Sequence, residues 1–253
     1  MNRASQTQIP ARWRALARVA WAGYAALILL VFLIALPVRY EQQLQDPYSL
    51  IPSLDLLGFT IEFFAVYGTT LDILMAVGFF SIATLTYWRK AADWMVLLVS
   101  LTLLSFPIAI LPVSTALAEV NPAWNYLVLF LRGLGFLFLG LTLYLFPNGR
   151  VVPPAARWVI ILWIVYPLLW PFFPGIIPPA AFTDISTSGD GFRLVLIVLL
   201  YGSGIIFQVY RYIRVSTQGE RQQTKWVVYG MGMSTVIFIV LTFSLVLTPA
   251  LQG

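Results

Sequence analysis

The 253-residue sequence contains no histidine and no cysteine, and only 10% of its residues are charged. Without these two residue types the chain cannot form a bis-histidine haem site, a Cys/His zinc site, a phosphoacceptor histidine or a disulfide. A soluble domain would have about a quarter of its residues charged. The composition therefore argues against a soluble domain and against enzymes that depend on these groups.

Apolar residues make up 60% of the chain and gather in seven long runs. A helix needs roughly 20 such residues to cross the hydrocarbon core of a bilayer. The sequence predicts an all-α, polytopic membrane helix bundle that forms one domain over residues 1–253, with its longest outer loop at Val38–Glu62. The predicted spans are Leu16–Pro37, Phe63–Tyr87, Trp94–Leu111, Tyr126–Phe146, Trp158–Ile177, Leu194–Tyr212 and Trp226–Leu247.

The basic residues predict the orientation of this bundle. Lys and Arg beside membrane helices stay on the cytoplasmic side. With seven crossings, most of them fall on one face, and the opposite face holds only Arg39 and Arg193. We expect a cytoplasmic N-terminus in a bacterial inner membrane, with the C-terminus outside. The net charge of +5 is then a topology signal, and nucleic-acid binding is not expected because the basic residues are dispersed over short loops.

Two charged residues lie inside predicted spans, Asp72 in the second and Arg132 in the fourth. Charge in the hydrocarbon is costly and usually faces the bundle interior. Their predicted depths differ by only ~5 Å at 1.5 Å per residue, so an ion pair is geometrically possible. Such a pair would be either a structural lock or a site that senses a ligand or a proton.

Small residues in the fourth span, Gly133, Gly135 and Gly140, are expected to allow close helix contact. No chemical site accompanies them. Lys90 and Lys225 stand at helix ends, where neither could hold a retinal, and no glycine-rich nucleotide loop follows a strand. We expect no cofactor, no metal and no catalysis.

The inner connections are short and carry distinctive residues. Trp88–Trp94 predicts a tight helical hairpin, and Phe146–Arg150 predicts a turn in which Pro and Asn-Gly supply the dihedral angles. Arg211–Lys225 is longer and basic enough to hold to an anionic leaflet. The candidate residues for contact with a partner or with lipid are Arg89, Lys90, Arg211, Arg214, Arg221, Gln222, Gln223, Thr224 and Lys225.

Three of these segments resemble the N-terminal membrane input region of bacterial sensor histidine kinases, a group that includes relatives of peptide-pheromone-sensing kinases. That group often shows a Trp-Arg-Lys…Asp-Trp turn, a Phe-Pro-Asp-Gly-Arg turn and a Glu-Arg-Gln-Gln-Thr-Lys-Trp segment. The matching segments here are Trp88–Trp94, Phe146–Arg150, with Asn148 in place of Asp, and Glu220–Trp226. The resemblance implies an input module, and the lack of histidine implies that no kinase domain accompanies it.

The leading hypothesis is a non-enzymatic membrane sensor or signalling module. Its outer half would receive a signal, and its inner hairpins would pass it to a signalling partner. A structural or assembly subunit of a larger membrane complex and a small transporter remain as alternatives. The partners expected from sequence are the lipid bilayer and a signalling protein or membrane complex.

Overall fold

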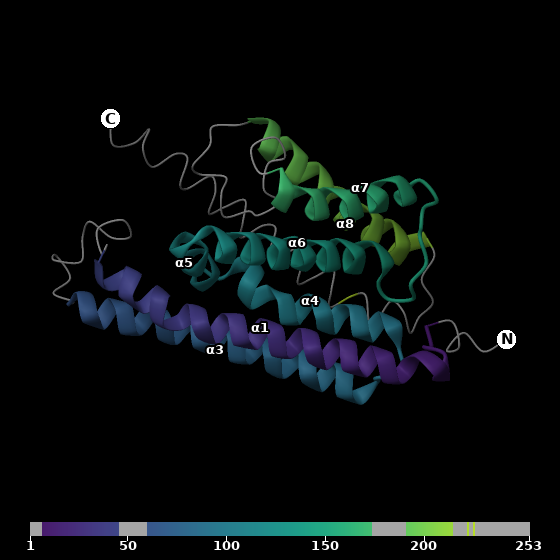
Figure 1. Cartoon of the computed structure of the whole chain (residues 1–253). Coiled ribbons are helices and arrows are strands. Elements are labelled where there is room, and N and C mark those ends of the chain that lie inside the picture. Colours follow the sequence, from purple (N-terminus) through teal and green to yellow (C-terminus); the bar gives the residue numbers. More distant parts are fainter. Residues whose placement is uncertain (1–6, 46–59, 174–190, 215–221, 223–224, 226–253) are drawn as a thin grey trace.

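The computed structural model describes residues 7–45, 60–173, 191–214, 222 and 225 (Figure 1). These residues form helices and no sheet, so the all-α prediction is confirmed. The helices are α1 (Ala11–Gln45), α3 (Ile61–Arg89), α4 (Trp94–Ile110), α5 (Val113–Val120), α6 (Pro122–Leu145), α7 (Ala156–Leu169), the 3-10 helix η2 (Trp170–Phe172) and α8 (Gly191–Arg214).

Three of the described helices, α1, α3 and α6, are each long and apolar enough to cross a membrane. The pair α4 and α5, bent by 61° at a short break, would count as a fourth. The chain thus has the helices of a membrane protein, and seven spans remain a prediction. The last predicted span, Trp226–Leu247, lies outside the described residues.

Two boundaries differ from the sequence prediction. Helix α1 does not stop at Pro37 but continues to Gln45, into the stretch expected to be an outer loop. Helix α5 is not among the predicted spans, because its eight residues, Val113–Val120, are too few to cross a bilayer. Helix α7 ends at Leu169, before the predicted end of the fifth span at Ile177, and η2, which contains Pro171, follows it.

Side-chain caps begin several of the helices. The Oγ1 atom of Thr60 accepts from Phe63 N at 3.2 Å before α3, and Asp93 Oδ1 accepts from Met95 N at 2.9 Å before α4. Asn121 Oδ1 accepts from Trp124 N at 3.0 Å before α6. Each cap satisfies an amide that has no acceptor within its own helix. Local polar residues therefore fix where these apolar helices start.

The helices pack in layers around α4 and α6 (Figure 1). Helices α1 and α3 run side by side along one flank, and both contact α4. Helix α6 packs on α4 and α5 and is covered on its other side by α7 and α8. Hydrogen bonds join the layers: Tyr24 Oη to Ser105 Oγ at 2.8 Å, Thr102 to Thr142 at 2.9 Å, and Tyr144 Oη to Ser203 Oγ at 2.8 Å.

The glycines of α6 stand at close helix contacts. A Cβ atom on Gly140 would overlap the indole of Trp163 in α7, and one on Gly133 would overlap the backbone oxygen of Pro167. A Cβ on Gly135 would come within 2.9 Å of Ser105 Cβ in α4. The predicted role of these small residues in helix packing is confirmed.

Candidate functional site

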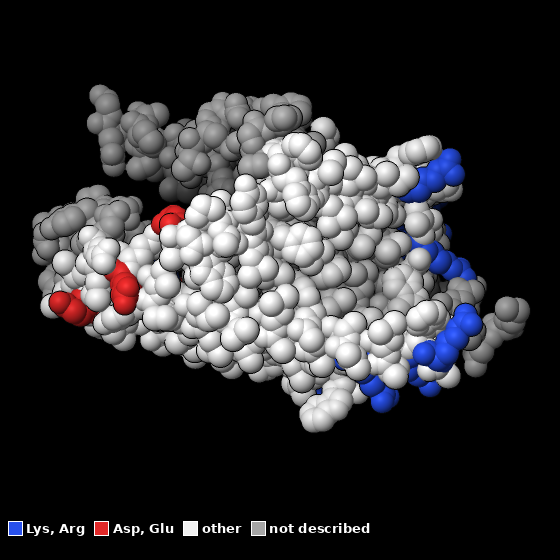
Figure 2. All heavy atoms as spheres, viewed as in Figure 1, with Lys and Arg blue, Asp and Glu red and all other residues white. Residues whose placement is uncertain are grey.

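Charge is separated along the long axis of the molecule. Figure 2 shows Lys and Arg gathered at one end and Asp and Glu at the other. We call these the basic end and the acidic end. Exposed residues of the basic end are Arg12, Arg14, Arg18, Arg89, Lys90, Arg150, Arg157 and Arg214, and those of the acidic end are Glu41, Glu62 and Glu119.

At the basic end, the Trp88–Trp94 turn is fastened to the start of the described chain. Ile9 N donates to Ala92 O at 2.7 Å, and Trp94 N donates to Thr7 O at 2.9 Å. Thr7 Oγ1 also donates to Asp93 Oδ2 at 3.0 Å. Since Asp93 caps α4 as well, one carboxylate links the N-terminal segment, the turn and α4.

The Phe146–Arg150 segment forms the predicted turn. Gly149 has φ +72°, and its N–H donates to Leu145 O at 2.7 Å. Asn148 Oδ1 accepts from Arg150 N at 3.2 Å. An aspartate oxygen could accept the same bond, so Asn148 preserves this feature of the turn. A Cβ on Gly149 would overlap the Trp94 indole, which places the two turns in direct contact.

The end of α8 is bonded to this second turn through Gln208 and Arg211. The Arg211 guanidinium donates to the backbone oxygens of Tyr144 at 2.8 Å and Leu145 at 3.1 Å, and also to those of Phe146 and Arg150. Gln208 Nε2 donates to the oxygens of Leu143 and Phe146. The last carbonyls of a helix lack partners within it and carry partial negative charge. Arg211 supplies both the donors and the positive charge.

Arg211 is therefore a correction to the sequence-based site. It was expected at a partner or lipid surface, but it is only 2% exposed because the carbonyls at the end of α6 hold it. Arg89, Lys90 and Arg214 are exposed, and so are Gln222 and Lys225. Arg221, Gln223 and Thr224 lie outside the described residues.

Toward the acidic end, polar side chains of α1 and α3 meet between the two helices. The Gln43 amide nitrogen, turned toward α3, donates to Thr69 Oγ1 at 3.2 Å and Ala65 O at 3.0 Å. Its oxygen accepts from Arg39 Nη2 at 3.2 Å. Gly68 makes room, since a Cβ there would come within 2.6 Å of the end of the Gln43 amide. We call Arg39, Gln43, Thr69 and Asp72 the outer polar cluster.

Asp72 and Gln43 are almost fully buried in this cluster, at 8% and 4% exposure. Arg39 lies within electrostatic range of the Asp72 carboxylate. Arg39 Nη1 also donates to Gln42 Oε1 at 3.0 Å, and Gln42 Nε2 donates to Glu119 at 2.8 Å. Hydrogen bonds thus run from Gln43 through Arg39 and Gln42 to the surface carboxylate of Glu119 on α5.

The sequence marks Asp72 as a candidate site residue, but it does not indicate that Arg39 lies near it. Arg39 and Gln43 are four residues apart, and Thr69 and Asp72 are three apart, so each pair shares one helix face. That spacing is visible in the sequence once α1 is extended beyond Pro37. Arg132 is 6% exposed on α6, which packs against α4, α5, α7 and α8. The Asp72–Arg132 pair remains a prediction.

No group of three or more metal-ligating side chains occurs in the part of the chain that the structure describes. Comparison with family models, curated proteins and solved structures gives no match. The function is therefore argued from the geometry of the two ends.

Proposed function

We propose that the protein is a non-enzymatic signalling module of the bacterial inner membrane, with seven spans and a cytoplasmic N-terminus. It would work like the input region of a sensor histidine kinase and pass its signal to a partner protein. The observation that carries the proposal is the contact network at the basic end. There the N-terminal segment, the Trp88–Trp94 turn, the Phe146–Arg150 turn and the end of α8 touch in series.

The outer polar cluster supports a receiving role for the opposite half. It links α1 to α3 through polar and charged side chains. The strength of their hydrogen bonds and charge interactions depends on the local dielectric and on any added charge. The same two helices run the length of the molecule to the basic end (Figure 1). A shift of α1 against α3 would therefore move the N-terminal segment relative to the Trp88–Trp94 turn. Rigid helices with two arrangements are a physical route for such coupling.

The exposed polar residues of the basic end would form the output surface. Arg89, Lys90 and Arg214 are exposed there, and Gln222 and Lys225 follow α8. Arg211 has a different task, because its bonds fix α8 on the second turn. If the Phe146–Arg150 turn moved, the Arg211 bonds would carry that displacement to the end of α8 and to the segment that follows it.

The test is co-purification of partners in mild detergent. The triple variant Gln222→Ala, Gln223→Ala and Thr224→Ala leaves the charge unchanged, so insertion and lipid attraction should survive. We expect it to lose a kinase or response regulator that the wild-type chain retains. Gln45→Ala removes an exposed amide at the acidic end and serves as the matched control, which should retain the partner. Retention of every partner by the triple variant, or a stoichiometric energy-transducing complex in place of a signalling protein, would refute the proposal.

A further inference from the structure

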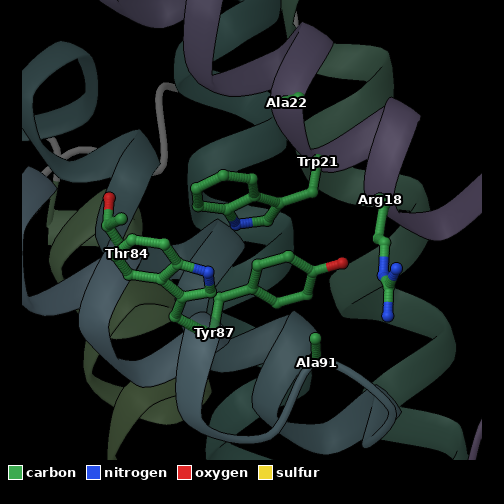
Figure 3. Close-up of a pocket in the computed structure, with 7 residues that line it drawn as sticks. Arg18, Trp21, Ala22, Thr84, Tyr87 and Ala91 are labelled. Atoms are coloured by element: carbon green, nitrogen blue, oxygen red, sulfur yellow. The ribbon is translucent and has the colours of Figure 1, made fainter.

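A pocket of about 580 Å³ lies between α1 and α3 at the basic end (Figure 3). Its lining includes Arg18, Trp21, Thr84, Tyr87 and Trp88. The volume falls within the ~300–1,000 Å³ typical of ligand sites. None of the bonds described for the outer polar cluster or the α8 attachment involves these residues, so the pocket is a separate feature.

The aromatic wall of the pocket is rigidly held. The rings of Trp21 and Tyr87 stack with centroids 4.6 Å apart and an angle of 16° between planes. Trp21 Nε1 donates to Ser100 Oγ at 2.8 Å, and Ser100 Oγ donates to Ala83 O at 2.9 Å. This chain of bonds joins α1, α4 and α3 behind the wall. These bonds fix the Trp21 ring relative to α3 and α4.

Positive charge without a counter-ion stands beside the wall. Arg18 is exposed, and no carboxylate among the described residues pairs with it. Asp93, the N-cap of α4, is not part of the pocket lining and accepts from Thr7 and Met95. The arginine therefore offers its guanidinium donors to an external anion, and a phosphate fits that planar fork.

A second unsatisfied donor points the same way. The Tyr87 hydroxyl is buried and has no hydrogen-bond partner among the described residues. In Figure 3 it is directed toward the side of the pocket where Arg18 lies. A buried hydroxyl is unfavourable when it is left unpaired. An anionic oxygen between Arg18 and Tyr87 would satisfy both groups.

The surroundings favour a lipid over a soluble phosphate. Trp88 at the pocket edge is 80% exposed, as expected of a tryptophan at the headgroup level. Val19, Ile82 and Leu85 nearby on α1 and α3 are exposed and apolar. An acyl chain could lie on this surface while its headgroup occupies the pocket, whereas a free phosphate would leave the apolar surface uncovered.

We propose that this pocket binds the phosphate headgroup of an anionic phospholipid. Arg18 contacts the phosphate, Tyr87 donates its hydroxyl to a phosphate oxygen, and the acyl chains lie along α1 and α3. The site goes beyond the proposed signalling function and does not depend on it. A lipid here would bridge the two helices that join the acidic and basic ends.

The test is native mass spectrometry of the full chain in detergent, titrated with phosphatidylglycerol, phosphatidylcholine or inorganic phosphate. We expect phosphatidylglycerol to bind more tightly than phosphatidylcholine. Arg18→Gln should weaken phosphatidylglycerol binding about tenfold, since hydrogen bonds to charged groups are the stronger kind. Tyr87→Phe should weaken it about threefold, since a hydrogen bond from a neutral group contributes less.

Arg157→Gln is the matched control, because Arg157 is an exposed arginine of the same end that lies on α7, outside the pocket. It should leave lipid binding unchanged. Thermal unfolding without lipid should be the same for Arg18→Gln and the wild-type chain, which separates lost binding from lost folding. The lipid site would be overturned if Arg157→Gln weakened phosphatidylglycerol binding as much as Arg18→Gln does, or if phosphatidylcholine bound as tightly as phosphatidylglycerol. It would also be overturned if only inorganic phosphate bound in a way that depends on Arg18. Partner co-purification is read separately, so failure here leaves the proposed function standing.

Discussion

The Trp94 indole occupies the space that a side chain on Gly149 would need. This contact joins two turns that lie far apart in the sequence, Trp88–Trp94 and Phe146–Arg150. It also explains why glycine stands at position 149, where φ is +72° and the neighbouring ring leaves no room for a Cβ atom.

Gly149→Ala should therefore destabilise the protein for two reasons. The positive φ disfavours any residue with a Cβ by about 1–2 kcal/mol, and the overlap with Trp94 adds a packing cost. Thermal unfolding in detergent measures the sum. In a Trp94→Ala background only the backbone term should remain, so the same substitution should cost less there. Equal costs in both backgrounds would show that the ring contact contributes nothing.

Arg211→Met should lower the free energy of unfolding by about 2–4 kcal/mol, because several carbonyls at the end of α6 lose a charged donor. Arg214→Gln is the control, since Arg214 is an exposed arginine one turn further along α8. Its cost should stay within about 0.5 kcal/mol, as for other surface changes. Chemical or thermal unfolding in one detergent compares the two. Similar losses for both variants would contradict the structural role of Arg211.

Gly140→Ala should destabilise the α6–α7 contact by about 1–3 kcal/mol, because the new methyl group meets the buried Trp163 ring. Gly78→Ala in α3 is the matched change, since nothing lies within 4 Å of a Cβ there. Alanine has the better helix propensity, so Gly78→Ala should be neutral or stabilising by about 0.5–1 kcal/mol. Thermal midpoints of the two variants should move in opposite directions, and a shared direction would argue against close packing at Gly140.

Asp72 should be energetically coupled to Arg39. Asp72→Asn and Arg39→Gln should each destabilise, and the double variant should lose less than the sum by about 0.5–3 kcal/mol. A parallel cycle with Arg132→Gln tests the pair predicted from sequence. If the changes in unfolding free energy simply add in the Arg39 cycle, Asp72 and Arg39 do not interact. If they add in the Arg132 cycle, Asp72 and Arg132 do not interact.

The orientation can be tested with reporter fusions. A periplasm-active reporter after Gly253 should be active, and a cytoplasm-active reporter at the same place should be silent, because seven spans with the basic end inside put the C-terminus outside. A fusion after Arg157 should show the reverse pattern. Cytoplasmic activity after Gly253 would require a different number of spans.

The sequence predicts the cores of the helices well, because long apolar runs leave few other structures open to the chain. It does not predict the helical stretch from Arg39 to Gln45, since this stretch is polar and follows a proline. Its helix is supported by bonds to α3, and those partners cannot be seen along the chain. Helix α5 was missed for a related reason, because it is short and follows the bend after Ile110.

In the candidate site, too, some residues can be predicted from the sequence and others depend on contacts that only the fold creates. The position of Asp72 inside an apolar run marks it as a candidate, and the surplus of basic residues marks the segments at the basic end. Neither signal distinguishes a buried arginine from an exposed one. Arg211 and Arg214 look alike in sequence, and only the position of the α6 carbonyls makes one of them internal. The aromatic pocket at Arg18 was missed because Trp21 and Tyr87 come from different helices and meet only in the fold.

The unequal lengths of the helices have a mechanical consequence. At 1.5 Å per residue, the 29 residues of α3 span ~44 Å, and the 14 residues of α7 span ~21 Å. The hydrocarbon core of a bilayer is ~30 Å thick, so a bilayer around the bundle would meet a helix longer than its core at α3 and one shorter than its core at α7. Tilting relieves the first mismatch and local thinning relieves the second. A change in bilayer thickness would therefore act in opposite directions on α3 and α7, which lie on opposite flanks of the bundle.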